Sequence, residues 1–388
     1  MATRYVVAAT LVTAVLVGAS AGAAKNEVVS DGSGVVFSVF EGLPPSGACP
    51  GLYVVDARTR KISWLGGWDA RRQDTAFYPS FTAGGTLSYG HWVDPSSSQP
   101  LVDIFAGRQS VARAYAVTGW AWSPRREELA FGRLAKGGRR LELVLASVTG
   151  AKRVLDASIG FVISWLHDGS GLVYGQRIGS SDVITFVRRD GRGRRDLARN
   201  AVGPLVSPDG RRVAFLRASS PDGTGTEELW VVATRGGRAR KVLGPVAVGR
   251  LRHAVWLSNR ELLVQHGGMT DSIFNARDTL NRLDVDTRTE RPFLKRAFAL
   301  SLSPDRSRVL FVRPHRGDDT YYSIRTVRAS GRDEQLLAVT DEEDLNVGSF
   351  PVWKPARAQV GWVGDPAPFG ETEQKCVRRL TSLRARTP

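Results

Sequence analysis

The histidines are the side chains of this sequence best suited to bind a metal ion or to transfer a proton near neutral pH. There are five, and they are far apart in the chain: His91, His167, His253, His266 and His315. No pair of histidines, and no His with a Glu, has the spacing of a metal-binding motif, and Cys-x-x-Cys is absent. We therefore predict no metal site, because one would require histidines gathered from separate segments.

A group of carboxylates near residue 284 resembles part of a calcium-binding loop. The spacing Asp284-x-Asp286-x-x-x-Glu290 fits, but the glycine and the remaining oxygen ligands of such a loop are missing. The segment follows a short apolar run, as Asp56 does, so we interpret it as turn chemistry. The acidic run 341–344 has the charge to bind a cation or a basic partner, and we favour an exposed linker.

Motifs for covalent catalysis and nucleotide binding are also missing. The sequence has no Gly-x-Ser-x-Gly, no Ser/His/Asp set marked by a motif, and no phosphate-loop or dinucleotide fingerprint. We therefore predict no catalytic residue and no cofactor. Four aromatic residues, Trp64, Trp68, Tyr78 and Trp92, are candidates for a ligand-binding face, because aromatic platforms suit sugars or peptides. The alternative is that they pack irregular loops.

The elements that must position these side chains repeat along the chain. Eight times an apolar residue leads into a tight turn, and the turn leads into a short apolar strand. The clearest copy is Val206-Ser207-Pro208-Asp209-Gly210 followed by 211–215. The units start near residues 28, 80, 122, 165, 206, 256, 302 and 353. A period of about 40 to 50 residues made of short strands is typical of β-propeller blades.

The turn sequence explains how each unit folds. Ser, Pro, Asp and Gly in succession favour a type I turn between antiparallel strands. Later strands such as Glu228–Val232 complete a four-stranded blade. The predicted turn residues are Ser123, Pro124, Asp168, Gly169, Ser207, Pro208, Asp209, Gly210, Ser303, Pro304 and Asp305. We therefore predict an all-β fold: one propeller over residues 24–388, with eight blades favoured and seven as the alternative.

The position of a residue within the repeat also predicts where some of the tryptophans and histidines lie. Trp122, Trp165, Trp256 and Trp353 occupy the same place in their units, so they are expected in the core. His167 lies in a turn and His315 in a loop after the second strand. We therefore expect both to lie away from the propeller axis.

The first 23 residues have the pattern of a secretory signal peptide. Arg4 precedes the apolar run 5–17, and small residues follow, including Ala21-Gly22-Ala23. An uncleaved anchor is the alternative, but the run is shorter than the roughly 20 residues of a membrane span. No later segment is apolar enough to cross a bilayer. We expect a secreted, extracytoplasmic protein without a transmembrane segment after cleavage.

The chain is strongly basic. It has 54 Lys and Arg against 38 Asp and Glu, a formal charge of +16, and a dense basic tail at 375–388. Such charge attracts acidic polymers, anionic lipid or nucleic acid. Export argues against nucleic acid, and an acidic cell-wall polymer remains a candidate partner. Because the arginines are spread over many turns, we interpret the charge as a general bias of a solvated surface.

The only two cysteines, Cys49 and Cys376, precede the third strands of the first and last units. In a closed ring these units are neighbours. We therefore predict a disulfide between them, since an oxidising compartment permits the bond. Two unpaired thiols in loops are the alternative.

The copy Ser207–Phe215, together with Glu228–Val232, resembles the repeat of TolB-type, WD40-like propellers, and the likeness covers most of residues 26–363. The resemblance implies a non-catalytic protein that binds proteins or peptides through a propeller face, in some cases in the bacterial envelope. The amino-terminal α/β domain of TolB and a hydrolase domain have no counterpart here. We therefore expect a monomeric binding or scaffold module for an envelope or extracellular protein or peptide. The alternative is a propeller-type polysaccharide lyase or glycosidase whose residues come from separate blades.

Overall fold

The computed structural model describes most of the chain between residues 34 and 341. The described ranges are 34–39, 51–66, 68–69, 74–75, 77–94, 100–135, 138, 140–157, 162–179, 181–218, 225–247, 251–266, 279–315, 318–341, 352–354, 358 and 377–378. The signal segment 1–23, both cysteines and nearly all of the tail 375–388 lie outside them.

The described residues form seven four-stranded antiparallel sheets and one short hairpin. Each sheet is a blade, named here in chain order. Blade 1 is β30 (Val352–Lys354), β1 (Gly34–Val39), β2 (Gly51–Asp56) and β3 (Ile62–Gly66). Blade 2 is β6 (Phe77–Phe81), β7 (Leu87–Asp94), β8 (Leu101–Ala106) and β9 (Gln109–Tyr115). Blade 3 is β10 (Gly119–Trp122), β11 (Glu128–Leu134), β12 (Leu141–Ser147) and β13 (Lys152–Asp156).

The remaining blades follow the same pattern. Blade 4 is β14 (Ile163–Trp165), β15 (Gly171–Ile178), β16 (Ser181–Arg188) and β17 (Arg195–Arg199). Blade 5 is β18 (Val202–Val206), β19 (Arg212–Ala218), β20 (Thr226–Ala233) and β21 (Arg240–Ala247). Blade 6 is β22 (Leu251–Trp256), β23 (Glu261–His266), β24 (Thr279–Asp284) and β25 (Glu290–Lys295). Blade 7 is β26 (Phe298–Leu302), β27 (Arg308–His315), β28 (Asp318–Arg328) and β29 (Gln335–Asp341). The hairpin is β4 (Trp68–Asp69) with β5 (Asp74–Thr75).

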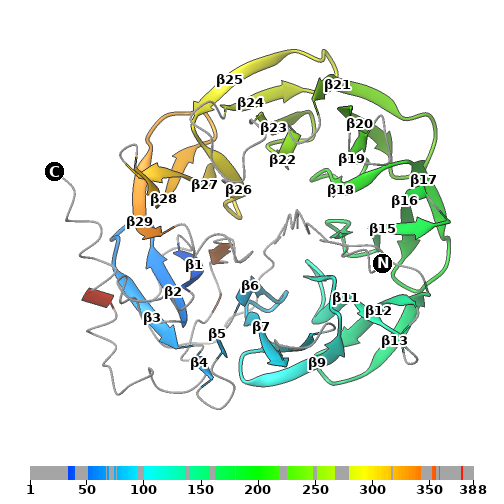
Figure 1. Ribbon diagram of the computed structural model, residues 1–388, viewed down its shortest axis with the longest axis horizontal. Helices are drawn as coiled ribbons and strands as arrows, with labels where there is room; N and C mark the ends of the chain where they lie inside the picture. The colour runs from blue at the N-terminus through cyan, green and yellow to red at the C-terminus, as the bar shows by residue number, and fades with distance from the viewer. Residues whose placement is uncertain are drawn as a thin grey trace, which may run out of the picture.

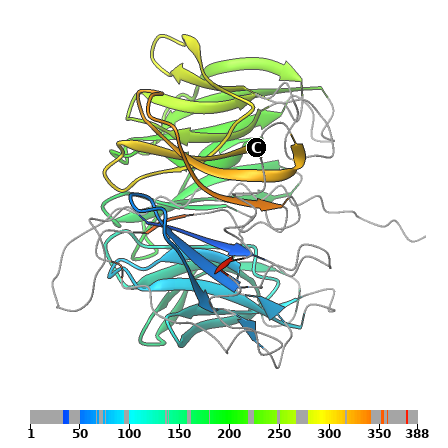
Figure 2. The ribbon, with the colours of Figure 1, turned by 90° about the vertical axis from the view of Figure 1, so that its left-hand side faces the viewer.

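The blades stand around a common axis, as Figure 1 shows, with the first strand of each blade innermost. First strands of neighbouring blades contact one another, for example β10 with β14 and β22 with β26. Figure 2 shows the ring from its edge, with strands running between its two faces. The predicted all-β propeller is confirmed. No helix among the described residues is long and apolar enough to span a membrane.

Apolar side chains on both sides of each sheet explain why the blades stack. The inner and middle strands are buried on both faces, as the run Val213, Ala214 and Phe215 illustrates with exposures of 0%. A sheet that is apolar on both faces must be covered on both, and only neighbouring blades can do this. The tryptophans at the repeat position are among the largest buried side chains between the blades. Trp165 and Trp256 are buried, and their indole Nε1 atoms donate to Ala121 O and Leu205 O of the preceding blade, each at 3.0 Å.

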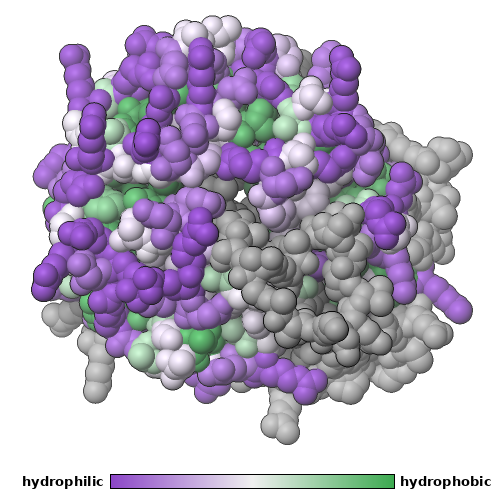
Figure 3. Space-filling view, turned by 180° about the vertical axis from the view of Figure 1, so that it is seen from behind, coloured by the Kyte–Doolittle hydropathy of each residue, from purple (hydrophilic) through white to green (hydrophobic). Residues whose placement is uncertain are grey.

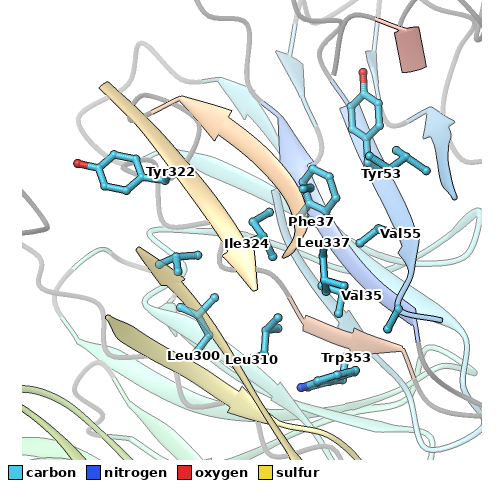
Figure 4. Packing of buried hydrophobic residues seen from close by; sticks show 14 of the residues in the cluster. Val35, Phe37, Tyr53, Val55, Leu300, Leu310, Tyr322, Ile324, Leu337 and Trp353 are labelled. Atoms are coloured by element: carbon cyan, nitrogen blue, oxygen red, sulfur yellow. The ribbon is translucent and has the colours of Figure 1, made fainter. Parts of the chain in front are cut away.

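The ring closes by pairing its two ends within blade 1. Strand β30 pairs antiparallel with β1, with Val36 opposite Val352, Val35 opposite Trp353 and Gly34 opposite Lys354. Figure 4 shows Trp353 and Val35 in the core between blades 1 and 7, together with Leu310 and Leu337. The favoured count of eight blades is therefore wrong, and the alternative of seven is correct. The repeats near 28 and 353 were counted as two units, but they belong to one blade, whose first strand comes from the carboxyl-terminal part of the chain.

Candidate functional site

The two faces of the ring are built from different connections. In an antiparallel blade, the turns from first to second strand and from third to fourth strand lie at the same end. The connections from second to third strand and from blade to blade lie at the other end. We call these ends the turn face and the loop face. Contacts between neighbouring blades agree with this arrangement, since Asp209 N donates to Asn259 Oδ1 (3.0 Å) between the first turns of blades 5 and 6.

The basic charge of the protein is concentrated on the turn face. The segments between strands there contain sixteen Lys and Arg but eight Asp and Glu. Among the described residues, the connections of the loop face contain two Arg and two Asp: Arg140, Arg296, Asp69 and Asp74. The turns of this face therefore carry an excess of eight positive charges, spread over the turns of all seven blades as the sequence indicates.

Most of these cations are free of ion pairs. Within the described part of the chain, only Arg189, Arg194 and Arg260 among the sixteen have a carboxylate within 4 Å. The other thirteen are Arg58, Arg60, Lys61, Arg108, Arg125, Arg126, Arg192, Arg211, Arg235, Arg238, Arg288, Arg306 and Arg332. Figure 3 shows the side of the ring opposite to that seen in Figure 1, and hydrophilic side chains cover most of its described surface. These twelve arginines and one lysine give the turn face a positive electrostatic potential.

Two of the three paired arginines, Arg189 and Arg194, join neighbouring blades at this face. Arg189 of blade 4 bonds both oxygens of Glu128 in blade 3, with Nε 2.5 Å from Oε2. This hydrogen bond lowers the pKa of Glu128, so the carboxylate stays ionised. Arg194 of blade 4 likewise donates to Asp156 of blade 3 at 2.7 Å. These contacts fix the third turn of blade 4, which carries the unpaired Arg192.

The first turns of the blades form an inner ring on the same face. In the turn Ser207–Gly210, the amide of Gly210 donates to Ser207 O (2.8 Å), and Ser207 Oγ donates to Asp209 (2.6 Å). The turn at Ser303 has the same bonds. In both turns, burial alone would raise the pKa of the aspartate, but hydrogen bonds from serine and backbone outweigh it. Asp209 and Asp305 therefore remain ionised while their oxygens are engaged within their own turns.

The structure corrects the placement of His167. It lies in the first turn of blade 4, directly after the inner strand β14, and therefore at the axial end of the turn face rather than away from the axis. The backbone oxygen of His167 accepts a hydrogen bond from Arg125 Nε of blade 3 (3.3 Å). Sequence reasoning missed this because it treated all turns alike, whereas only the first turn of each blade adjoins the inner strand.

The aromatic candidates separate into three groups. Tyr78 and Trp92 lie in one cluster of blades 2 and 3, where both contact Phe77, with ring centroids 5.1 and 4.7 Å away. Trp64 is 2% exposed and belongs to the core between blades 1 and 7. Trp68 is in β4, and its side chain lies outside the described residues. The four therefore do not form one platform, although Tyr78 and Trp92 are close together.

Tyr78 has an unusual backbone. Its φ is 49°, and it lies where the register between β6 and β7 shifts, between Phe77 and Ser80. A bulky residue in this region is uncommon and costs about 1 kcal/mol or more. The bulge turns the ring toward Trp120 of blade 3, at 5.4 Å between centroids. Burial raises the pKa of the Tyr78 hydroxyl.

The residues considered for metal binding are dispersed or engaged elsewhere. His91 and His315 are buried in blades 2 and 7, and the side chains of His253 and His266 lie outside the described residues. Asp284 Oδ1 accepts the amides of Asp286 and Thr287, both at 2.9 Å, as a turn-forming aspartate does. Asp286 is contacted by Arg212 and Arg240. No group of three or more His, Cys, Asp or Glu in the described part of the chain has metal-binding geometry.

Comparisons with known proteins identify the fold. Neither a scan against known protein families nor a search of curated proteins found a match. A puromycin-hydrolysing peptidase of Mycobacterium tuberculosis aligns with a TM-score of 0.52 and 17% identity, over 78% of this chain and 53% of the peptidase. A puromycin hydrolase gives 0.51 and 16%, over 79% of this chain and 52% of that one. TolB from Acinetobacter baumannii gives 0.45 and 13%, over 79% and 63%.

These comparisons support the propeller architecture and no finer assignment. The chain spans less than two thirds of the length of each of these structures. At identities below one fifth, the similarity concerns the fold, while function depends on sites that each propeller carries for itself. The propeller fold that the resemblance to TolB-type repeats implied is confirmed by the ring of four-stranded sheets.

Proposed function

We propose that this protein is a secreted, non-catalytic binding module that holds an acidic segment of an envelope or extracellular protein on its turn face. The observation that carries the proposal is the excess of eight positive charges on that face, with thirteen cations free of ion pairs among the described residues. Long-range attraction by such a face raises the rate of encounter with an acidic partner and fixes its orientation. A rigid ring presents these charges without ordering a loop on binding.

The arginines of the third turns carry most of this charge. The first turns of the blades together contain five Lys and Arg and four Asp and Glu. The third turns together contain eleven Lys and Arg and four Asp and Glu. Arg192 of blade 4 and Arg235 and Arg238 of blade 5 lie on adjoining third turns, and all three are exposed. Together they offer several guanidinium groups to successive carboxylates of one extended peptide.

The test is binding of a fluorescent peptide rich in Asp and Glu, measured at two salt concentrations. The triple variant Arg192→Gln/Arg235→Gln/Arg238→Gln is expected to bind at least about tenfold more weakly, with a smaller dependence on salt. The matched control is Arg140→Gln/Arg177→Gln/Arg199→Gln, which removes three charges at the loop-face ends of blades 3 and 4. Equal losses in both variants would contradict a dedicated face. A preference for polygalacturonate over the peptide would replace the protein partner by an anionic polysaccharide.

Secretion belongs to the same proposal. Its support is the charged, apolar and small-residue pattern of residues 1–23. Mass spectrometry of the protein recovered from outside the cytoplasm is expected to find an amino terminus at Ala24. An intact Met1 on the exported protein would instead mean that the segment is retained as an anchor.

A further inference from the structure

We infer that Arg195 and Arg211 bind one carboxylate of the acidic partner on the turn face, at the boundary of blades 4 and 5. These two residues, together with Arg235, are called the blade 4–5 anion site. The inference rests on the proposed function for its ligand. Its geometry rests on a comparison with the boundary of blades 5 and 6, where the protein supplies the carboxylate itself.

At the boundary of blades 5 and 6, carboxylates of the third turn of blade 6 are bound by arginines. Asp286 Oδ1 lies 2.9 Å from Arg212 Nη1 and 3.2 Å from Arg240 Nη2, both of blade 5. Asp284 in the same turn lies with its Oδ2 2.6 Å from Arg260 Nε. Burial alone would raise the pKa of Asp286, but the hydrogen bonds and charges of Arg212 and Arg240 outweigh it. Asp286 therefore remains ionised as the counter-ion of this boundary.

The third turn of blade 5 has the same position in its blade as that of blade 6. The amide of Thr234 in blade 5 donates to Arg211 O at 2.9 Å. The amide of Val285 in blade 6 donates to Arg260 O at the same distance, 2.9 Å. Thr234 therefore corresponds to Val285, and Arg211 corresponds to Arg260.

The residues before and after this amide differ between the two turns. Blade 6 has Asp284 and Asp286, whereas blade 5 has Ala233 and Arg235. Blade 5 therefore lacks both of the carboxylates that the arginines of the neighbouring boundary bind. Arg235 instead adds a further positive charge to the boundary of blades 4 and 5.

Arg195 corresponds to Arg240, because each begins the fourth strand of its blade and donates to the third turn of the next blade. Arg195 Nε and Nη2 donate to Thr234 O at 3.2 and 2.8 Å, and Nη1 donates to Gly193 O at 3.4 Å. The guanidinium also stacks on Phe186, with its central carbon 4.0 Å from the ring centroid. These contacts leave the edge formed by one N–H of Nη1 and one of Nη2, and such an edge binds a carboxylate through two parallel hydrogen bonds.

Neither Arg195 nor Arg211 has a carboxylate at ion-pair distance in the part of the chain that the structure describes. Asp209, in the same first turn as Arg211, is engaged there, because its Oδ1 accepts Ser207 Oγ (2.6 Å) and the amide of Arg211 (3.0 Å). Burial lowers the pKa of Arg195, so its charge is partly removed from water without a counter-ion. A carboxylate of the partner supplies this counter-ion, in the place that Asp286 has one blade further along the ring.

The first test measures the dissociation constant of fluorescent hexaglutamate. Arg195→Gln and Arg211→Gln are each expected to weaken binding about tenfold, because each removes a charged donor to the bound carboxylate. Arg240→Gln is the matched control, since it removes the same charge at the corresponding position, where Asp286 already occupies the guanidinium. It should change binding by less than about twofold at physiological salt, which screens distant charges. Thermal unfolding checks that Arg195→Gln is folded, because Arg195 joins two blades.

A second test supplies the missing carboxylate from within the protein. Arg235→Asp places an aspartate where blade 6 has Asp286, and this side chain is expected to pair with Arg195 or Arg211. The variant should melt at a higher temperature and bind hexaglutamate about tenfold more weakly. Arg140→Asp makes the same change of charge on the loop face and should do neither.

A third readout does not depend on the peptide. The Nε–H signal of Arg195, identified by its loss in Arg195→Gln, is followed by NMR as inorganic phosphate is added, with sodium chloride at equal ionic strength as the reference. Phosphate is expected to shift this signal with saturation in the unmodified protein, and the shift should be lost in Arg235→Asp. Equal shifts with phosphate and chloride would overturn the site.

The outcomes separate the site from the proposed function. If hexaglutamate binds Arg195→Gln and Arg211→Gln as tightly as the unmodified protein, the proposed function stands and the blade 4–5 anion site is wrong. If phosphate shifts the Arg195 signal and hexaglutamate does not bind, the site stands and the acidic-peptide function fails. A loss in Arg240→Gln as large as that in Arg195→Gln would show that only the net charge of the face matters, and it too overturns the site.

Discussion

Single residues decide how closely the blades approach one another, and Gly90 is the clearest case. A Cβ built on Gly90 would lie 2.8 Å from the ring of Trp120 and 2.9 Å from the ring of Phe77. Gly90→Ala is therefore expected to destabilise the protein by about 1–3 kcal/mol, because two buried aromatic rings must shift. Gly175→Ala is the matched control, since Gly175 is also in a second strand and its added Cβ would meet no atom within 4 Å. Urea unfolding measures both; equal stabilities would mean that the aromatic cluster repacks freely.

His167 makes stability depend on pH at the same scale. The folded protein holds its pKa below the ordinary 6.5, so the unfolded chain takes up the proton more readily. Above pH 6.5, His167 is neutral in both states and does not change the free energy of unfolding. As the pH falls from 6.5 to the pKa of His167 in the folded protein, the free energy of unfolding decreases, and below that pKa it decreases no further on account of His167. His167→Gln should thus lose less stability than the unmodified protein between pH 8 and pH 5. An identical decrease in the free energy of unfolding for both proteins, measured with urea, would show that burial and the charges of Arg125 and Arg306 do not lower the pKa of His167.

At the scale of elements, the repeated tryptophans differ in what their indoles do. Trp256 Nε1 donates to Leu205 O across the boundary of blades 5 and 6, whereas Trp122 Nε1 is buried without a hydrogen-bond partner among the described residues. Trp256→Phe is therefore expected to cost about 1–2 kcal/mol more than Trp122→Phe, because only the first loses an interblade bond. Thermal unfolding of the two variants provides the comparison. A larger cost for Trp122→Phe would mean that packing volume, rather than the bond, determines the difference.

Elements also mark the limit of what the sequence predicts. The turn at Ser207 and the burial of Trp256 follow from local patterns, because a turn and a strand are specified within a few residues. The blade count does not, because β30 pairs with β1 from the other end of the chain. The concentration of arginines on one face depends on which connections share an end, and their spacing along the chain does not reveal this.

For the whole molecule, a covalent bond is expected to add most to stability in blade 1, where β30 pairs with β1 and joins the two ends of the chain. Cys49 and Cys376 lie outside the described residues, but their neighbours in sequence belong to this region. Val377 packs against the core that contains Tyr53, and Gly51 begins β2. A disulfide here requires Cα atoms within about 7 Å. In the chain-entropy model, a disulfide that closes a loop of this length stabilises the folded protein by about 5 kcal/mol.

The disulfide prediction is tested by melting the exported protein with and without reductant. The melting temperature should fall on reduction, and Cys49→Ser/Cys376→Ser should melt at the lower temperature regardless of reductant. A tryptic digest of the unreduced protein should contain one linked peptide pair. Quantitative labelling of two free thiols before reduction would show that β30 closes the ring alone.

The pairing of β30 with β1 also sets an order of events during synthesis. Strand β1 leaves the ribosome more than three hundred residues before its partner, and until then its hydrogen-bonding edge is open. Blades 2 to 7 have all four strands consecutive in the chain, so they can form as they emerge. Blade 1 cannot be completed until translation has nearly ended. Until then the open edge of β1 is available to other strands, and pairing of β30 with β1 is therefore the step that removes this edge.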